Sequence, residues 1–416
     1  MNTKPFEAYE SEVRSYCRRF PAVFTKAKGS KYWDEDGNEY IDFFNGAGAL
    51  NYGHNNEEIK GQLIDYLESD GVLHALDMYT VPKREFIETF ESKILKPRGL
   101  DYKIMFTGPT GTNAVEAALK LARKVKKRPG VFALMGAFHG MTLGALALTT
   151  DADSRGGAGV PLDNVTHVPA PGMFEGLDTI AYMQTLIDDD HSGVERPSAL
   201  VIETIQAEGG VNVMPVQWLR DVRAFCDRND ILLIVDDIQV GVGRSGYFFS
   251  FERAGIVPDI VTLSKSIGGY GMPMALTLFR PELDIWTPGE HNGTFRGNQL
   301  SIVAARAGID YFVAHRIDEE ARRKGEIIRG FLEKEVLPLD SRLQVRGIGM
   351  IWGVDFSGVG DKMCGKVLSS CFKKKVVIES AGRKNAVLKI MAALTIEDDV
   401  LLDGLGRLRD AIRENL

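Results

Sequence analysis

Short apolar runs without alternation recur through the middle of the chain, separated by longer segments with helical spacing. The run Ile-Leu-Leu-Ile-Val at 231–235 is typical, and two carboxylates follow it. Such runs predict strands buried on both faces, as in parallel sheets covered by helices. The pattern therefore indicates an α/β fold with a seven-stranded, mostly parallel sheet. The predicted strands are Lys103–Thr107, Val131–Met135, Val165–Val168, Ala199–Glu203, Leu232–Asp236, Ile260–Ser264 and Met274–Phe279.

The first fifty residues follow a different pattern. Residues 31–42 form two short strand-like runs around Asp36-Gly37-Asn38, which has the residues of a hairpin turn. Residues 10–16 are compatible with a short helix or with an arm. The glycine-rich segment 45–54 allows the backbone to approach a ligand or a partner chain closely, or it is an ordinary loop.

The C-terminal part is mainly helical and then returns to strands. Helical spacing runs from Leu300 to about Glu335, strand patterns follow near 344–356 and 376–379, and a last helix begins near Glu397. This mixture predicts a smaller α+β domain. We expect that domain to combine residues 1–48 with residues 311–416, around a large domain of residues 49–310.

Composition narrows the functional classes. The chain has 416 residues, 44% hydrophobic and 26% charged, with a formal net charge of -7. These values fit a globular enzyme and argue against a basic nucleic-acid-binding surface. The four cysteines form no C-x-x-C pair, so we expect free thiols and neither a metal site nor disulfides. No signal sequence and no apolar run of membrane-spanning length is present, so we expect a cytoplasmic protein that binds no membrane.

An acid and a lysine stand at the ends of two successive predicted strands. Asp236 ends one run, and Lys265 follows the next. Since the carboxyl ends of parallel strands meet at one edge of a sheet, both side chains are expected at the ligand-binding edge. Pyridoxal phosphate needs such a pair, because a lysine carries the cofactor and a carboxylate keeps its ring nitrogen protonated. Taken singly, each residue is more often a helix cap or a solvated loop residue.

Two further segments suit the same cofactor. Thr107-Gly108-Pro109-Thr110-Gly111-Thr112-Asn113 precedes a helical stretch, and free N–H groups at a helix start bind anions. A Walker-type loop is excluded because no Gly-Lys-Ser/Thr follows. Phe138, after the second strand, has a ring that can stack on a flat cofactor, although an aromatic at this place is more often core. For the adjacent His139 we expect a structural role.

The motifs occur in a recognisable order. Gly111-Thr112, Phe138-His139-Gly140, Glu203–Gly210, Asp236-Asp237-Ile238-Gln239, Ser264-Lys265 and His291–Asn298 follow one another along the chain. Together they resemble the class III, or ω-, aminotransferases of pyridoxal-phosphate fold type I, over nearly the whole chain. The resemblance implies an aminotransferase with pyridoxal phosphate as cofactor, acting on amino and keto acids as a homodimer or larger homo-oligomer.

For the cofactor ring, the resemblance implies roles for five residues. Lys265 would be the Schiff-base lysine, and Asp236 would pair with the ring nitrogen. Gln239 would bind the ring hydroxyl, and Phe138 would stack on one face. Glu203 would lie near the cofactor. Family members usually carry Asp-Glu where this chain has two aspartates, and we expect the second acid to face away from the ring.

For the phosphate and the substrate, the resemblance implies another five. Gly111 and Thr112 would bind the phosphate, and Thr294 would reach the phosphate of the neighbouring subunit. Glu208 would act in substrate selection, where family members pair it with an arginine that holds an α-carboxylate. Lys389 stands in place of that arginine and offers a point charge, not a planar fork. It is either the carboxylate-binding group or a surface lysine on a strand.

Three segments narrow the expected substrate. Residues 10–21, 43–56 and 108–113 are similar to members that use glutamate to aminate aspartate 4-semialdehyde, giving 2,4-diaminobutyrate. The alternatives are ornithine or 4-aminobutyrate transamination, and diaminobutyrate formation for a natural-product pathway. A cofactor-binding scaffold without turnover is a third class, but such a scaffold has no need of Lys265.

Overall fold

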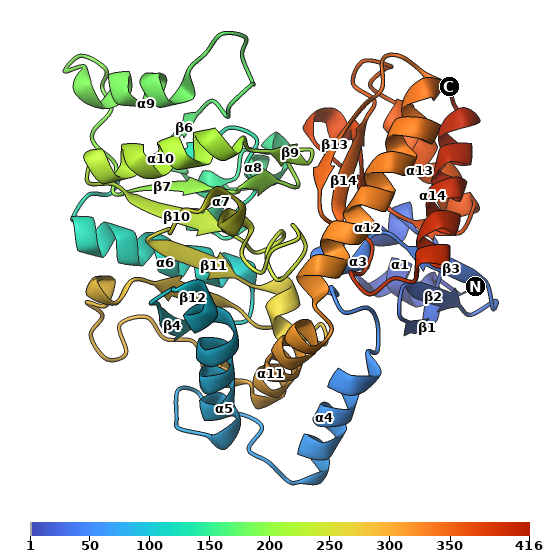
Figure 1. The fold of residues 1–416 in the computed structure, drawn as a ribbon, viewed down its shortest axis with the longest axis horizontal. Coiled ribbons are helices and arrows are strands. Elements are labelled where there is room, and N and C mark those ends of the chain that lie inside the picture. The colour runs from blue at the N-terminus through green and yellow to red at the C-terminus, as the bar shows by residue number, and fades with distance from the viewer. Residues whose placement is uncertain (1) are drawn as a thin grey trace.

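Seven strands lie side by side in the central sheet of the computed structural model, which describes residues 2–416 (Figure 1). Only β12 runs antiparallel to its neighbours, so the predicted mostly parallel sheet is confirmed. Strand ends differ from the predicted ones by no more than two residues. In sheet order, the strands are β4 (Lys103–Phe106), β12 (Leu276–Phe279), β11 (Ile260–Leu263), β10 (Leu232–Asp236), β7 (Ala199–Ile202), β5 (Val131–Leu134) and β6 (Val165–Val168).

Alternate side chains of the central strands enter two separate apolar cores. In β10, Leu233 and Val235 join one core, whereas Leu232 and Ile234 join the other. Helix α10 (Val216–Arg228) contributes to the first core, and helix α6 (Gly111–Lys126) contributes Val115, Ala118, Leu119 and Ala122 to the second. The absence of polar alternation in these strands thus follows from burial of both faces.

The two ends of the chain come together in smaller sheets. In one, β1 (Phe24–Lys28), β2 (Lys31–Asp34) and β3 (Glu39–Asp42) are extended by the parallel strand β15 (Val376–Val377). The other has the order β13 (Gln344–Ile348), β14 (Ile351–Asp355), β17 (Val387–Ile390) and β16 (Glu379–Ala381). Figure 1 shows the N-terminal strands beside these C-terminal elements. The predicted hairpin at 31–42 is confirmed as β2 and β3.

The domain division at residues 48 and 310 stays a prediction, and residue 310 lies inside helix α11 (Gln299–Ala314).

A two-stranded ribbon joins β8 (Ile205–Gln206) to β9 (Asn212–Val213). Among residues 2–416, no helix has both the length and the apolar character needed to cross a membrane. The remaining α-helices are α1 (Lys4–Tyr9), α2 (Tyr16–Arg19), α3 (Asn45–Gly48), α4 (Glu57–Glu68), α5 (Val81–Phe90), α7 (Leu143–Leu148), α8 (Ala152–Gly156), α9 (Thr179–Asp188), α11 (Gln299–Ala314), α12 (Ile317–Phe331), α13 (Met363–Lys373) and α14 (Asp398–Arg413).

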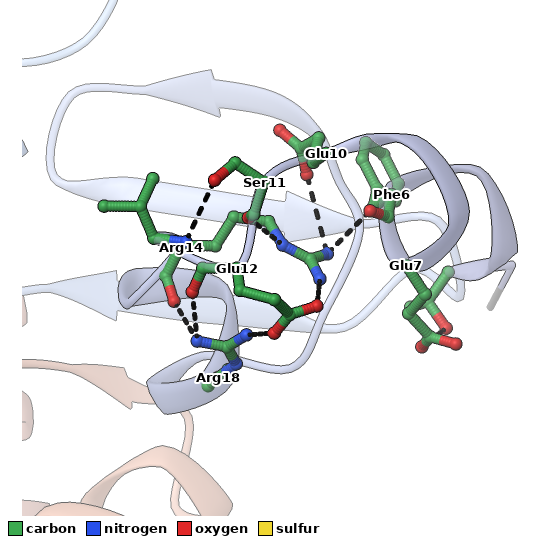
Figure 2. Close-up of polar contacts among 9 residues, drawn as sticks. Phe6, Glu7, Glu10, Ser11, Glu12, Arg14 and Arg18 are labelled. Carbon is green, nitrogen blue, oxygen red and sulfur yellow. Dashed lines mark hydrogen bonds and ion pairs between the residues drawn. The ribbon is translucent and has the colours of Figure 1, made fainter.

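Residues 10–15 are not helical, so of the two forms considered for residues 10–16 the helix is wrong. Two arginines hold this arm in place (Figure 2). Arg14 donates to the carbonyl oxygens of Phe6 and Ser11, and Arg18 donates to the carbonyl oxygens of Glu12 and Arg14. Because the arginines satisfy the backbone carbonyls, the arm can stay ordered without helical hydrogen bonds.

Candidate active site

A cavity of about 170 Å³ lies where strands β7, β10 and β11 end. Of the ten residues selected from the sequence, only Thr294 and Lys389 are absent from its lining. The other eight come from the start of α6, from the ends of strands and from the loops that follow them. They are Gly111, Thr112, Phe138, Glu203, Glu208, Asp236, Gln239 and Lys265.

The parallel pairing of β10 and β11 places Asp236 and Lys265 at one edge. Asp236 is in register with Thr262, three residues before Lys265. Lys265 begins a 3-10 turn, Lys265–Gly268, and has a φ of 52°. A left-handed backbone at a non-glycine residue costs energy and is often found at functional sites. Burial lowers the pKa of the Lys265 amine, since the charged form is poorly solvated.

Asp236 is held by a buried histidine. Its Oδ2 lies 2.7 Å from Nδ1 of His139, and its Oδ1 accepts hydrogen bonds from Thr262 Oγ1 and the Ile238 N–H. Burial alone would lower the pKa of His139, but the hydrogen bond and charge of Asp236 outweigh it and raise the pKa. The sequence interpretation of His139 missed this contact, because no local pattern links residues 97 positions apart.

The start of α6 also lines the cavity. Gly111 and Thr112 are its first residues, so their N–H groups have no acceptor one turn earlier in the helix. The Thr112 hydroxyl lies 2.5 Å from the Thr142 hydroxyl. Gly140 passes so close that a Cβ there would stand 2.6 Å from Thr112 Oγ1, which only glycine avoids. The start of α6 thus offers N–H donors to an anion, with the Thr112 hydroxyl beside them.

Phe138 and Glu203 line the same cavity. The N–H of Phe138 donates to Glu203 Oε1 at 3.0 Å, and the aromatic ring is half-buried. Burial raises the pKa of the Glu203 carboxyl to about 7. The second acid of the strand end, Asp237, accepts from the Ser250 N–H at 2.9 Å and is absent from the cavity lining, as expected.

Lys389 lies behind the cavity and is fully buried, so its interpretation as a surface lysine is wrong. Its Nζ is 2.5 Å from Glu208 Oε1, 2.9 Å from Glu379 Oε1 and 3.5 Å from Gln239 Oε1. Burial alone would lower the pKa of Lys389, but the charges of Glu208 and Glu379 outweigh it and raise the pKa. No local sequence pattern points to Glu379 as a partner of this lysine.

The partner of this lysine in the cavity wall is Glu208. Burial would raise the pKa of Glu208, but the charge of Lys389 outweighs it and lowers the pKa to about 2. Gln239 donates to Glu208 Oε1 and to the Ala47 carbonyl oxygen, both at 3.0 Å. By contrast, Thr294 is exposed in the turn Thr294–Gly297 and lies outside the cavity of its own chain.

The chain belongs to the class-III aminotransferase family, whose model matches residues 14–412. It is 52% identical over 418 aligned residues to the diaminobutyrate–2-oxoglutarate transaminase of Streptomyces coelicolor, covering 98% of this chain and 97% of that protein. The enzyme of the same name from Halalkalibacterium halodurans is 51% identical, with 98% and 96% covered.

Solved structures agree with the fold. The ornithine aminotransferase of Toxoplasma gondii superposes with a TM-score of 0.86 at 25% identity, covering 99% of this chain and 93% of that one. An aminotransferase from Bacillus anthracis gives a TM-score of 0.88 at 21% identity, with both chains fully covered. The fold is therefore pyridoxal-phosphate fold type I.

Class III aminotransferases use pyridoxal phosphate, and the T. gondii structure was reported with this cofactor at its active site. The residues of the cavity fit the group. Its lining holds a carboxylate, the N–H groups of a helix start with the Thr112 hydroxyl beside them, a buried amine and an aromatic ring. These are the partners that a pyridine nitrogen, a phosphate, an aldehyde and a planar ring require.

The contact between His139 and Asp236 predicts a pH response. Because Asp236 raises the pKa of His139, the imidazole should keep its charge above its ordinary titration range. In Asp236→Asn, burial should prevail and move the pKa below the ordinary value of about 6.5. NMR titration of histidine-labelled protein measures both, with the His139 signal assigned through His139→Gln. Equal pKa values in the two proteins would contradict the coupling.

Proposed function

We propose that this chain is a diaminobutyrate–2-oxoglutarate transaminase. It would move an amino group from glutamate to the terminal carbon of aspartate 4-semialdehyde, giving 2,4-diaminobutyrate, and would also run the reverse reaction. The observation that carries this proposal is the identity of about half of all positions, over nearly the full length, to relatives of that name. We further propose that the product serves ectoine biosynthesis, an expectation that rests on the sequence likeness.

The cofactor would be held by the residues expected from the sequence. Asp236 would face the pyridine nitrogen, Phe138 one face of the ring, and Gly111 and Thr112 the phosphate. Lys265 would carry the cofactor covalently. Two other residues would complete the ring site: Glu203 would lie near the ring, and Gln239 would bind the ring hydroxyl. When bound, pyridoxal phosphate supplies the electron sink that stabilises a negative charge left on the substrate carbon.

The amine of Lys265 would take a proton from the reacting substrate carbon and return it. Its lowered pKa supports this role, because more of the amine is neutral near pH 7 and able to accept a proton. His139 would hold Asp236 in one orientation and balance its charge inside the protein. Both roles require water to be kept out, which the buried carboxyl ends of β10 and β11 favour.

The two substrates would place their α-carboxylates differently. Glutamate reacts at its α-carbon, whereas diaminobutyrate reacts at its terminal carbon, so one fixed cation cannot serve both in the same way. We propose that Glu208 stays on Lys389 for diaminobutyrate and moves aside for glutamate, whose α-carboxylate then takes its place. The support is the 2.5 Å contact of Glu208 with Lys389, together with the position of Glu208 in the cavity wall.

We also propose a homodimer in which Thr294 completes the phosphate site of the partner subunit. Exposed apolar side chains lie beside the Thr294 turn, to which they are tied by hydrogen bonds of Ala75 with Gly297 and of Gln299 with Leu73. Monomers rarely expose so many large apolar groups together, and two-fold pairing is the commonest way to cover them. These side chains are Val72, Leu73, Leu76, Met78, Tyr79, Val81 and Phe295.

Other partners would be small amino and keto acids. A role with nucleic acid is not proposed, because the formal net charge is -7. We propose a cytoplasmic location, supported by the four cysteines, which are all free thiols in the structure.

A substrate panel tests the function. With 2-oxoglutarate as acceptor, kcat/KM for 2,4-diaminobutyrate should exceed that for ornithine by roughly tenfold or more, since one methylene is worth about 10–200-fold. It should also exceed the value for 4-aminobutyrate, which has the same chain length but lacks the α-amino group. Glutamate formation in a coupled assay gives the rates, and Lys265→Ala serves as the inactive control. A higher kcat/KM for ornithine or 4-aminobutyrate would overturn the substrate assignment.

The shared phosphate site is tested by subunit mixing. Thr294→Ala should weaken cofactor binding about tenfold to a hundredfold, because a hydrogen bond to a charged group contributes roughly 1.5–3 kcal/mol. Heterodimers of Thr294→Ala with Lys265→Ala, purified with two different tags, should regain one intact site per dimer. A Thr294→Ala protein with wild-type cofactor affinity, or heterodimers without recovered activity, would exclude the shared site.

A further inference from the structure

Lys389 has a second carboxylate partner that does not belong to the cavity wall. Glu379 lies directly opposite Lys389 in the antiparallel pairing of β16 and β17, and its Oε1 is 2.9 Å from the lysine Nζ. Cross-strand pairs of opposite charge stabilise each other when they face one another in this way. The contact is therefore built into the backbone register of the sheet.

The two carboxylates differ in how freely they can move. The side chain of Glu208 is 31% exposed and lines the cavity, whereas that of Glu379 is 2% exposed and does not. Glu208 lies in the loop between β8 and β9, where its carbonyl oxygen accepts from the Gly382 N–H. Its backbone is thus held while its side chain faces open space. Glu208 is the partner that can leave, and Glu379 is the one that stays.

If Glu208 moved away and no other carboxylate remained, the buried Lys389 would tend to lose its proton and with it its charge. An ammonium without solvent or a counter-ion readily loses its proton, in contrast to a guanidinium. Lys389 is 0% exposed, so water cannot replace the missing carboxylate. We propose that Glu379 is the fixed counter-ion that keeps Lys389 charged while Glu208 is displaced, so that a lysine can receive the substrate's α-carboxylate. This proposal deepens the exchange of partners proposed above and rests on it.

The other titratable groups that face Lys389 cannot take over this role. Lys265 of the turn after β11 is itself basic. Tyr16 of α2 has a pKa raised by burial and by the nearby carboxylates, so it is neutral near pH 7. Gln239 offers only an amide oxygen at 3.5 Å. With Glu208 displaced, Glu379 is the remaining carboxylate in contact with Lys389 in residues 2–416.

The number of carboxylates in contact with Lys389 is the same before and after the exchange of partners. Lys389 lies between two carboxylates before the exchange, and again once a substrate carboxylate has replaced Glu208. Lys389 keeps a carboxylate partner throughout and is never an unpaired buried charge, which typically costs several kcal/mol. Glu379 is accordingly a specificity-determining residue that acts through Lys389.

The test measures binding of glutarate, which has two carboxylates and no reacting group, to the holoenzyme by calorimetry from pH 6.5 to 9. In Glu208→Gln, where only Glu379 remains opposite Lys389, affinity should not change with pH and no proton should be taken up. In Glu208→Gln/Glu379→Gln, affinity should fall about tenfold per pH unit above the lowered pKa of Lys389, with proton uptake on binding. Adding Lys389→Arg should restore a flat profile, because arginine keeps its charge.

The control is Asp355→Asn, on the neighbouring strand β14, whose carboxylate pairs with Arg346 and not with Lys389. It should bind glutarate as the wild type does. A pH-dependent affinity in Glu208→Gln alone overturns the proposal, and this variant decides the matter even if the double variant does not fold. A flat profile in the folded double variant overturns it as well. Unchanged glutarate affinity in Lys389→Met would instead refute Lys389 as the carboxylate-binding group. The outcome of the substrate panel, which tests the proposed function, does not depend on any of these titrations.

Discussion

The parallel pairing of β10 with β11 is the constraint on which the site depends. Because both strands end at the same edge, Asp236 and Lys265 enter one cavity although 28 residues separate them in the sequence. Because alternate side chains enter the two cores, β10 and β11 are mainly apolar until they end, and the buried Thr262 of β11 donates to Asp236. The carboxylate of the candidate site therefore stands on the last residue of the buried strand β10.

A second constraint acts at the substrate end of the cavity. Burying Lys389 would be unfavourable without partners, and the chain supplies two carboxylates from different elements. One comes from the loop between β8 and β9 and the other from β16, so the lysine joins the two-stranded ribbon to the C-terminal sheet. The cluster is thus both a connection between these regions and the place where we propose that substrates are distinguished.

Local sequence patterns predicted the fold and the residues that we propose hold the cofactor. The central strands were predictable because burial of both faces leaves a mainly apolar run. Asp236 and Lys265 stand at or just after the ends of such runs, and Gly111 and Thr112 begin the helix that follows β4. What escaped prediction depends on contacts between distant residues. His139 meets Asp236, and Glu379 meets Lys389, only after the sheets have formed. The arm at residues 10–15 was ambiguous for a related reason, since arginine contacts to backbone carbonyls decide its form.

The most direct test of the central claim locates the cofactor on the chain. Reducing the holoenzyme with borohydride fixes pyridoxal phosphate to the residue that carries it, and digestion with mass spectrometry then identifies that residue. The structure predicts the added mass on the peptide that contains Lys265, and no such peptide from Lys265→Ala. Attachment to any other lysine, Lys389 included, would contradict the account.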